Sequence, residues 1–525
     1  MVYQSLKTHL DQIIESGQAS CLSESLIGLE KESLRVAEDG AISQTAHPPG
    51  LGSALTNPTI TTDFSEALLE LITPPCSSAK QALAYLDDIQ KYVYSKLDNE
   101  IMWATSMPCV VRGETDIPIA QYGSSNIGTM KTVYRRGLGY RYGRTMQVIA
   151  GIHFNYSVSD SFWDMYQSLL GDTGSRQDFI ANQYMGLVRN MLRYGWMIPY
   201  LFGASPAVCK SFLHGEPTIL SDFNEGTFYE PYATSLRMGD IGYTNSQEDM
   251  AGIKANYSSI DDYVSSLRCA ITKPYAPYEE IGVKVDGEYR QLNANILQIE
   301  NEYYSTIRPK QITLKNEKPT TALHRRGVAY IEVRSIDVNA FDPLGISEEQ
   351  LYFLETLVLF CLLQDSPVLD DMAMTEVDMN LLQVAHYGRK PGLQLSRNDQ
   401  PILLKDWALE LLEAMQAVAS LLDEVKRCDS YSKSLATQLE CVNDPSKTPS
   451  ARMLAAMRKN NEGFFHFAQR QSIQYYDYFT SRALSAEQKE FFEKMSAESI
   501  AMQKEIEQAD TLSFDEFLQQ YFAKD

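Results

Sequence analysis

Alternating acidic side chains in one short stretch constrain the fold of this chain more than any other feature. Residues 28–36 (GLEKESLRV) contain Glu30 and Glu32, which point to the same face of an extended strand because successive side chains alternate. Two carboxylates on one half-buried surface repel each other, and burying an unpaired carboxylate is costly. The stretch therefore predicts a β-strand whose acids need a cation, and a divalent metal ion is the natural candidate.

Three further runs repeat this arrangement, because they are short, apolar on one face and polar on the other. The runs and their polar residues are 65–73 with Glu66 and Glu70, 148–156 with His153 and Asn155, and 330–335 with Glu332 and Arg334. For any one strand alone, the solvated face of an antiparallel sheet is the favoured interpretation. Four strands that share the pattern, one with an arginine and one with a histidine, favour a lined cavity.

Hard oxygen ligands with a single imidazole suit Mg²⁺ or Mn²⁺ better than zinc, which prefers cysteine and histidine in a tetrahedral site. The eight cysteines are far apart and include no C-x-x-C pair, so neither a zinc knuckle nor a redox motif is indicated. We expect them to be ordinary buried or surface thiols.

Composition predicts a cytoplasmic catalyst. The 525 residues exceed the roughly 250 to 300 over which a single hydrophobic core grows, so a composite body or two lobes is expected. The net charge of −22 argues against nucleic acid as a partner, since phosphate backbones bind basic surfaces, but it allows a phosphorylated small molecule held by metal. The sequence contains no signal peptide and no apolar run of about 18 residues, so we expect no membrane partner.

Helical and extended patterns divide the chain into two parts. Helical spacing is expected at residues 3–17, 78–100 and 160–200, where Pro199 ends the helix, and short strands dominate residues 280–340. Beyond Pro343 we expect helices at residues 348–365, 403–426, 450–470 and 486–508. The pattern predicts a single α+β catalytic unit over residues 1–525, with a mixed strand and helix core at 1–345 that carries the active site and a mainly helical portion at 346–525.

Several nucleotide-binding motifs are missing. Residues 137–143 resemble a dinucleotide loop but are one residue too long, and no Gly-Lys pair of a Walker A motif exists. The arginine-rich and tyrosine-rich segment 134–144 suits stacking on nucleobases, capture of a small anion by guanidinium groups, or pairing with nearby acids, and these interpretations stay open. The same interpretations apply to Arg237.

A set of motifs in a fixed order resembles the proteobacterial-type glutamate–cysteine ligase family. The resemblance covers roughly residues 26–393, and beyond that point it reduces to helical character. The motifs are residues 28–36, 61–74, 120–123, 131–135, 198–206 (IPYLFGASP), 297–302, 307–310, 330–335 (YIEVRS) and 388–392 (GRKPG).

The resemblance implies an enzyme that uses ATP to join the γ-carboxyl of L-glutamate to the amine of L-cysteine, the first step of glutathione synthesis. It implies a curved, mainly antiparallel sheet that forms a glutamine synthetase-like funnel surrounded by helices. By that analogy the metal ligands, for Mg²⁺ or Mn²⁺, are Glu30, Glu32, Asp63, Glu70, His153 and Glu332. Arg334 is expected to contact the phosphoryl group transferred from ATP.

The resemblance also implies an amino-acid pocket. Its cysteine slot would consist of Phe64, Tyr134, Leu138, Gln147, Tyr243 and Tyr304, with Arg135 and Arg237 binding substrate carboxylates. Composition alone would place such tyrosines in the core or on the rim more often than on a ligand. Two alternatives remain: a glutamate ligase with another amine acceptor, and a non-catalytic metal-binding protein. Since no second subunit is required, we expect a monomer.

Overall fold

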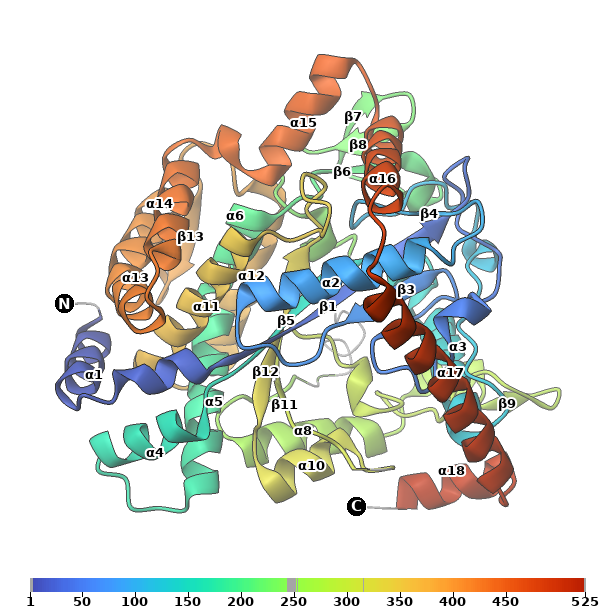
Figure 1. Ribbon diagram of the computed structural model, residues 1–525, viewed down its shortest axis with the longest axis horizontal. Coiled ribbons are helices and arrows are strands. Elements are labelled where there is room, and N and C mark those ends of the chain that lie inside the picture. Colours follow the sequence, from blue (N-terminus) through green and yellow to red (C-terminus); the bar gives the residue numbers. More distant parts are fainter. Residues whose placement is uncertain (1–2, 243–251, 253, 315, 524–525) are drawn as a thin grey trace.

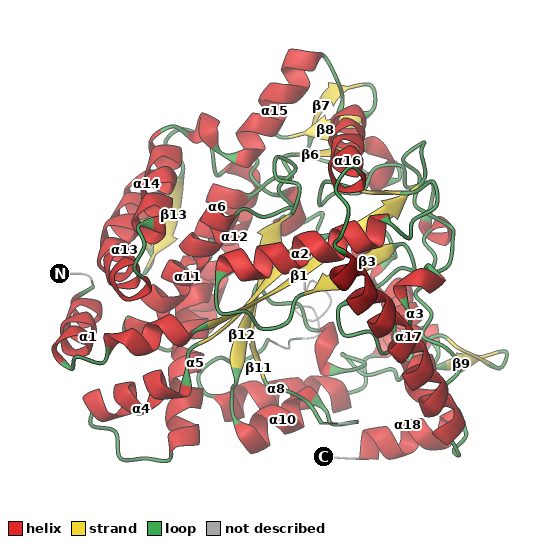
Figure 2. Cartoon of the chain, in the orientation of Figure 1, coloured by secondary structure: helices red, strands yellow, loops and turns green. Residues whose placement is uncertain are grey.

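The computed structural model describes residues 3–242, 252, 254–314 and 316–523. Its centre is a seven-stranded sheet in the order β11-β12-β5-β1-β3-β2, with the short β4 paired to β1, and every pairing in it is antiparallel. Helices surround this sheet (Figures 1 and 2). The predicted α+β class is therefore confirmed. The strands are β1 Leu26–Val36, β2 Ile60–Thr62, β3 Leu68–Ile72, β4 Ile101–Met102, β5 Gly151–Ser157, β11 Ile307–Lys310 and β12 Tyr330–Asp337.

Three small antiparallel sheets lie outside the central one. They consist of β6 Ala207–Cys209 with β8 Thr227–Tyr229 and β7 Ser221–Asn224, β9 Lys284–Val285 with β10 Glu288–Tyr289, and β13 Gln394–Arg397 with β14 Gln400–Leu403. Within the described residues, none of their strands pairs with a strand of the central sheet.

Helices up to residue 326 are interspersed among the strands. They are α1 Gln4–Glu15, α2 Ala79–Tyr94, α3 Asn126–Tyr142, α4 Asp160–Leu169, α5 Arg176–Tyr194, α6 Met197–Phe202, α8 Ile260–Thr272, α9 Ala276–Ile281 and α10 Pro319–Arg326. The predicted helix at residues 160–200 is three helices, and Pro199 lies inside the last of them, where its missing N–H is tolerated in the first turn.

Beyond β12, the regular elements of the described residues are helices apart from one hairpin, β13 with β14. The helices are α11 Glu348–Leu363, α12 Asp371–Tyr387, α13 Leu404–Lys426, α14 Ser430–Asn443, α15 Pro449–Asn460, α16 Phe464–Thr480, α17 Ala486–Ala509 and α18 Phe514–Ala523. The predicted helix at 450–470 is wrong in one respect, because Asn461 takes a left-handed conformation with φ of 52° and ends α15 there. Helices α12 and α14 were not predicted from the sequence.

One face of the central sheet is the core of the molecule. Leu29, Phe154 and Val333 on this face are fully buried, and α2, α5 and α6 contact the strands that carry them. Helix α11 contacts α2 and α5 in turn and is buried along most of its length. The other face of the sheet is therefore the one left for polar side chains.

The C-terminal helices return to the N-terminal part of the chain. In Figure 1, α17 runs from the region of α2 toward α3, and the Ser124 amide donates to Glu507 over 2.8 Å. Helix α18 contacts α3. Among the helices in the described part of the chain, none has the length and apolarity needed to cross a bilayer.

Candidate active site

The strand register brings the predicted acids onto one face. Glu30 of β1 is paired with His153 of β5, and Glu32 is paired with Glu70 of β3. On the other side of β5, Asn155 is paired with Glu332 of β12. Directly paired residues of an antiparallel sheet point to the same side, so polar side chains from four adjacent strands meet above the sheet.

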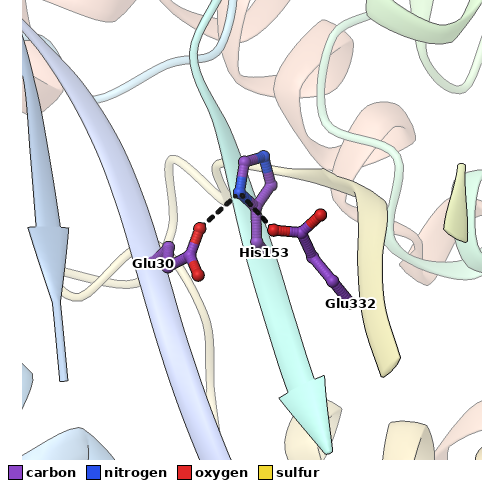
Figure 3. Close-up of side chains that lie close together, drawn as sticks. All are labelled: Glu30, His153 and Glu332. Carbon is purple, nitrogen blue, oxygen red and sulfur yellow. Dashed lines mark hydrogen bonds and ion pairs between the residues drawn. The ribbon is translucent and has the colours of Figure 1, made fainter. Parts of the chain in front are cut away.

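Glu30, His153 and Glu332 form a compact cluster, shown in Figure 3 on three neighbouring strands. One ligand atom from each lies within 4.8 Å of the others. His153 Nδ1 is 2.9 Å from Glu30 Oε2 and 4.0 Å from Glu332 Oε1. The second oxygen of Glu30 accepts a 2.8 Å hydrogen bond from Asn155. This geometry orients two carboxylates and one imidazole toward a shared point.

A second group of carboxylates continues the acidic face. Glu32 accepts a 2.6 Å hydrogen bond from the Gly151 amide, and its other oxygen is 3.7 Å from His153 Nε2. Burial, reinforced by the charges of Glu30, Asp63 and Glu32, raises the pKa of Glu70 well above its usual range. Without added positive charge this part of the face cannot hold all of its carboxylates ionised.

Two cations border the cluster at Glu332. Lys310 Nζ lies 3.2 Å from Glu332 Oε1, and Arg334 donates to Glu332 Oε2 over 3.2 Å. Burial by itself would raise the pKa of Glu332, but the charges of Lys310 and Arg334 outweigh it and hold that pKa well below its usual range. Glu332 is therefore ionised and already paired.

Arg334 lies on the same face as Glu332 because it is two residues further along β12, and it is part of a β-bulge. The register between β12 and β5 shifts between Val333 and Ile336, so Arg334 and Ser335 together lie opposite His153. Among the described residues, no hydrogen-bond partner is present for the buried Nε of Arg334. That nitrogen is a buried donor whose hydrogen-bonding capacity the described residues leave unfilled.

A cavity of about 110 Å³ adjoins the acidic face. Seven of the eight residues predicted for the amino-acid pocket line it, and Tyr243 lies outside the described residues. Those that line it are Phe64, Tyr134, Arg135, Leu138, Gln147, Arg237 and Tyr304, together with Glu32, Asp63, His153 and Arg334. The structure therefore brings the predicted pocket and the predicted metal ligands into one site.

Five further lining residues were not named as site residues: Tyr142, Met146, Asn301, Glu302 and Arg308. Three of these lie in motifs that carried the family resemblance, at 297–302 and 307–310. Glu302 is fully buried and accepts from Arg141 over 2.7 Å and from Tyr142 over 2.9 Å. Position within these motifs was the signal that could have identified Asn301, Glu302 and Arg308.

Helix α3 supplies one wall of the cavity. Ser125 caps its first turn by accepting from the Gly128 amide. Tyr134 and Leu138 are four residues apart, so they occupy the same side of the helix. The Arg135 guanidinium lies 4.6 Å from the Tyr122 ring centroid and donates from Nε to the carbonyl of Asp63. The helix thereby connects the cavity to the loop that holds Asp63.

Arg237 is held against β5 and β12. It is 1% exposed, donates to the carbonyl of Arg334 over 2.8 Å and lies 3.7 Å from Asp337. A Cβ added to Gly151 would lie 2.1 Å from Arg237 Nη2. Glycine at 151 is thus needed for the arginine to pass so close to β5.

A second cavity, of about 380 Å³, lies on the other side of Arg308. It shares Asn301 and Arg308 with the first cavity and includes Lys310, the partner of Glu332. Its other lining residues combine apolar and aromatic side chains with polar groups: Tyr263, Leu267, Glu300, Pro309, Gln311, Ile312, Thr313, Pro319, Thr320, Leu323 and Tyr330. The acidic cluster therefore lies next to two cavities of different size.

Comparison with known proteins gives a consistent result. Residues 10–384 match the glutamate–cysteine ligase family. A protein of Alcanivorax borkumensis described as a glutamate–cysteine ligase is 47% identical over 523 residues, which is 98% of this chain and 99% of the relative. A glutamate–cysteine ligase of Pseudomonas fluorescens is 48% identical over 518 residues, covering 99% of this chain and 97% of the relative.

Solved structures agree with the sequence relatives. The crystal structure of a glutamate–cysteine ligase from Francisella tularensis in complex with AMP superposes with a TM-score of 0.89 at 38% identity, covering 95% of this chain and 97% of that one. A bifunctional glutathione synthetase from Pasteurella multocida superposes with a TM-score of 0.69 at 26% identity, covering 92% of this chain and 57% of the longer protein.

Proposed function

The chain belongs to the glutamate–cysteine ligase family, and from that premise we propose how its own residues divide the catalytic work. The reaction joins the γ-carboxyl of L-glutamate to the amine of L-cysteine through a γ-glutamyl phosphate and converts ATP to ADP and phosphate. The observation that carries the proposal is the position of the Glu30, His153 and Glu332 cluster next to both cavities.

We propose that the cluster binds Mg²⁺, with Mn²⁺ as the alternative ion. Two carboxylates and one imidazole within 4.8 Å suit a hard divalent cation. A second ion among Glu32, Asp63 and Glu70 would offset the burial and the neighbouring negative charges that raise the pKa of Glu70. When bound, such ions would neutralise the negative charge of the phosphate groups. The proposal also explains why Asn155 and Gly151 hold the ligand oxygens in place.

Arg334 is the proposed catalytic residue for phosphoryl transfer and a contact for ATP. Its Nη1 is paired with Glu332, while its buried Nε has no hydrogen-bond partner among the described residues. Attack of a carboxylate on a phosphate brings two anions together, and a guanidinium at that point stabilises the charge that develops on the transferred group. Lys310, on the other oxygen of Glu332, supplies a second positive charge on the same side.

The smaller cavity is the proposed amino-acid site. Arg135 and Arg237 supply the positive charge for substrate carboxylates. The apolar and aromatic slot formed by Phe64, Tyr134, Leu138, Gln147 and Tyr304 would hold the side chain of cysteine. Tyr243 is part of the proposed slot on the family resemblance alone. The small volume supports a short side chain, although one methylene changes binding by only about 1 to 3 kcal/mol.

The larger cavity is the proposed adenine nucleotide site. Apolar residues such as Leu267 and Ile312 can contact a base, and Lys310 and Arg308 lie at the end nearest the acidic cluster. The AMP bound to the Francisella tularensis relative supports an adenine nucleotide in this chain too. This arrangement would deliver the terminal phosphate of ATP to the boundary between the two cavities.

We further propose that residues 1–525 act as a single catalytic unit, with the site in residues 1–345 and residues 346–525 as a mainly helical portion. The proposed site needs no second subunit, since the residues assigned to it belong to one chain, and we propose a monomer. The substrates are small molecules, and the net charge of −22 supports the absence of a nucleic-acid partner. A cytoplasmic site of action without a membrane partner agrees with the use of ATP and free cysteine.

Coupled measurement of ADP release tests the proposal. Full rate is expected with glutamate and cysteine together, and little with either alone or with neither. Substituting 2-aminobutyrate for cysteine is expected to retain activity, because the slot discriminates weakly between side chains of similar size. No ADP release with 2-aminobutyrate would reject the assignment of the slot, and a higher rate with ammonia or another amine than with cysteine would favour a different acceptor.

A further inference from the structure

Two buried thiols away from the acidic face contact each other. Cys109 Sγ and Cys209 Sγ are 2.7 Å apart, whereas the sulfurs of a disulfide are about 2.05 Å apart. Cys109 is 2% exposed and Cys209 5% exposed, and 100 positions separate them in the chain. Among the described residues, none of the other six cysteines has a sulfur atom as a hydrogen-bond partner.

Backbone contacts hold both cysteines in place. The Ser211 hydroxyl, two residues after Cys209, donates to the carbonyl of Cys109 over 2.9 Å. Cys209 is paired with Thr227 in the small sheet, and Val110 forms a bridge to Ala41. Forming a sulfur–sulfur bond would therefore require the two atoms to approach by only about 0.7 Å, with no need to bring distant backbone segments together.

We propose that Cys109 and Cys209 are a redox pair that forms a reversible disulfide, with a small-molecule disulfide as oxidant. The Cys209 thiolate attacks one sulfur of the oxidant, which forms a mixed disulfide and releases one thiolate. The Cys109 thiolate then attacks Cys209 Sγ, so that the protein disulfide forms and the second thiolate leaves. The two protein thiols lose two protons and two electrons, and the oxidant becomes two thiols.

The order of attack follows from the surroundings of the two thiols. Cys209 is at the end of β6, an edge strand of three residues, and the exposed Ser211 follows it closely. Burial, and then contact with Cys209, raises the pKa of the Cys109 thiol well above its usual range. Reaction therefore begins at Cys209 after local opening of the strand end, and its rate is limited by that opening.

The disulfide would connect two chain segments that each form a hydrogen bond with residues 145–150, beside the amino-acid cavity. Ser106, three residues before Cys109, accepts from the Ala150 amide over 2.9 Å and from the Val338 amide over 2.8 Å. His214, five residues after Cys209, has its Nε2 2.8 Å from the Thr145 hydroxyl. Residues 145–150 include Gln147 of the cavity. A covalent link between these two segments would restrain the motion of residues 145–150.

Equilibration of the full chain with mixtures of reduced and oxidised dithiothreitol tests the proposal. After acid quenching and alkylation under denaturing conditions, the eight thiols of the reduced protein are expected to fall to six, eight minus the two of this pair. Peptide mass spectrometry should find residues 109 and 209 linked, and excess reduced dithiothreitol should restore all eight thiols. Residues 109 and 209 that stay alkylated while other cysteines oxidise would overturn the proposal.

Matched variants distinguish the effect of this disulfide from the effect of oxidising other cysteines. In the oxidised wild-type protein, hydrogen exchange at residues 145–150 should slow and the thermal midpoint should rise. Both changes should be lost in Cys209→Ala and retained in Cys428→Ala, which removes an exposed thiol. Equal changes in all three proteins would contradict the proposal. If Cys209→Ala does not fold, the wild-type thiol count and peptide linkage decide the question alone.

Discussion

Glu30 and His153 are direct cross-strand partners, and the imidazole Nδ1 of His153 lies 2.9 Å from the Glu30 carboxylate. Burial tends to raise the pKa of Glu30, but the hydrogen bond from His153 and the charge of Lys310 more than offset it and lower that pKa. Strand pairing alone thus presents an ionised carboxylate and an imidazole at one point. This relationship is the basis of the proposed metal site.

Replacing Glu30 by glutamine should remove metal binding while leaving the fold intact. The amide keeps the shape of the side chain but loses the charge, and disturbing even an outer contact of a metal site costs about 10- to 100-fold in affinity or activity. We expect turnover to fall by more than about 100-fold. Because a bound ion stabilises the folded state, Mg²⁺ should raise the thermal midpoint of the wild-type protein but not that of the variant.

The exposed Glu38 provides the matched control for this experiment. Glu38→Gln removes the same charge from the surface, so both the Mg²⁺-dependent midpoint shift and the turnover should equal those of the wild-type protein. A Glu30→Gln variant that retained the full midpoint shift would show that Glu30 is not a ligand.

Much of the acidic face was predictable, because a two-residue period is a local property of the sequence. That period places Glu30 and Glu32 together, and it places His153 with Asn155. The β-bulge that sets both Arg334 and Ser335 opposite His153 is not encoded in such a period, since it depends on how β12 pairs with β5. Pattern reasoning nevertheless placed Arg334 beside Glu332.

The positions of loop residues could not be predicted from a periodic pattern. Asp63 follows the three-residue β2, and only the family resemblance pointed to it. Glu66 was expected to share a strand face with Glu70, but β3 begins at Leu68, so Glu66 lies in the preceding loop. The prediction of helix ends was wrong for a similar reason. The left-handed Asn461 divides the stretch 450–470, although its helical spacing of apolar residues continues through that position.

Enlarging the amino-acid slot should change which amine is accepted. Leu138 lines the small cavity, and Leu138→Ala would leave room for one more methylene. Since one methylene is worth about 1 to 3 kcal/mol in such a pocket, kcat/KM for homocysteine relative to cysteine should rise by about 10-fold or more. The control is Leu439→Ala on α14, which removes an exposed leucine and should leave the ratio unchanged. An unchanged ratio in Leu138→Ala would place the cysteine side chain elsewhere.

Removing the buried charge of Glu355 should destabilise the packing of the helices against the sheet. This fully buried carboxylate of α11 accepts from Ser25 over 2.8 Å, from Lys426 over 2.6 Å and from Tyr431. Glu355→Gln leaves the Lys426 ammonium without its partner, and breaking a buried pair in this way costs about 3 to 5 kcal/mol. Urea titration should show that loss in the free energy of unfolding.

An exposed ion pair serves as the comparison for Glu355. Asp429 and Lys433 are 2.6 Å apart on the surface of α14, where solvent screens their attraction. Asp429→Asn should leave the urea midpoint unchanged. A midpoint shift in Glu355→Gln no larger than that of Asp429→Asn would show that the buried network contributes nothing measurable.

The pH dependence of stability should reveal the charge on His386. Its Nδ1 lies 2.8 Å from Glu230 and its Nε2 lies 3.0 Å from Asp240. Burial works against the charged form, but the hydrogen bond and charge of Glu230, together with Asp240, raise the pKa of His386 above its ordinary 6.5. Between 6.5 and the raised value the folded protein holds a proton that the unfolded chain has lost.

The stabilisation from His386 is therefore complete below pH 6.5 and is lost as pH rises through the raised pKa. His386→Gln removes the titration, so its deficit in unfolding free energy relative to the wild-type protein should be largest near about pH 6 and smaller near about pH 9. Urea titrations at several pH values measure that difference, with the exposed His466→Gln as control. A deficit that stayed constant or grew with pH would mean that His386 is neutral in the folded protein. In that case Glu230 and Asp240 would bind an uncharged imidazole.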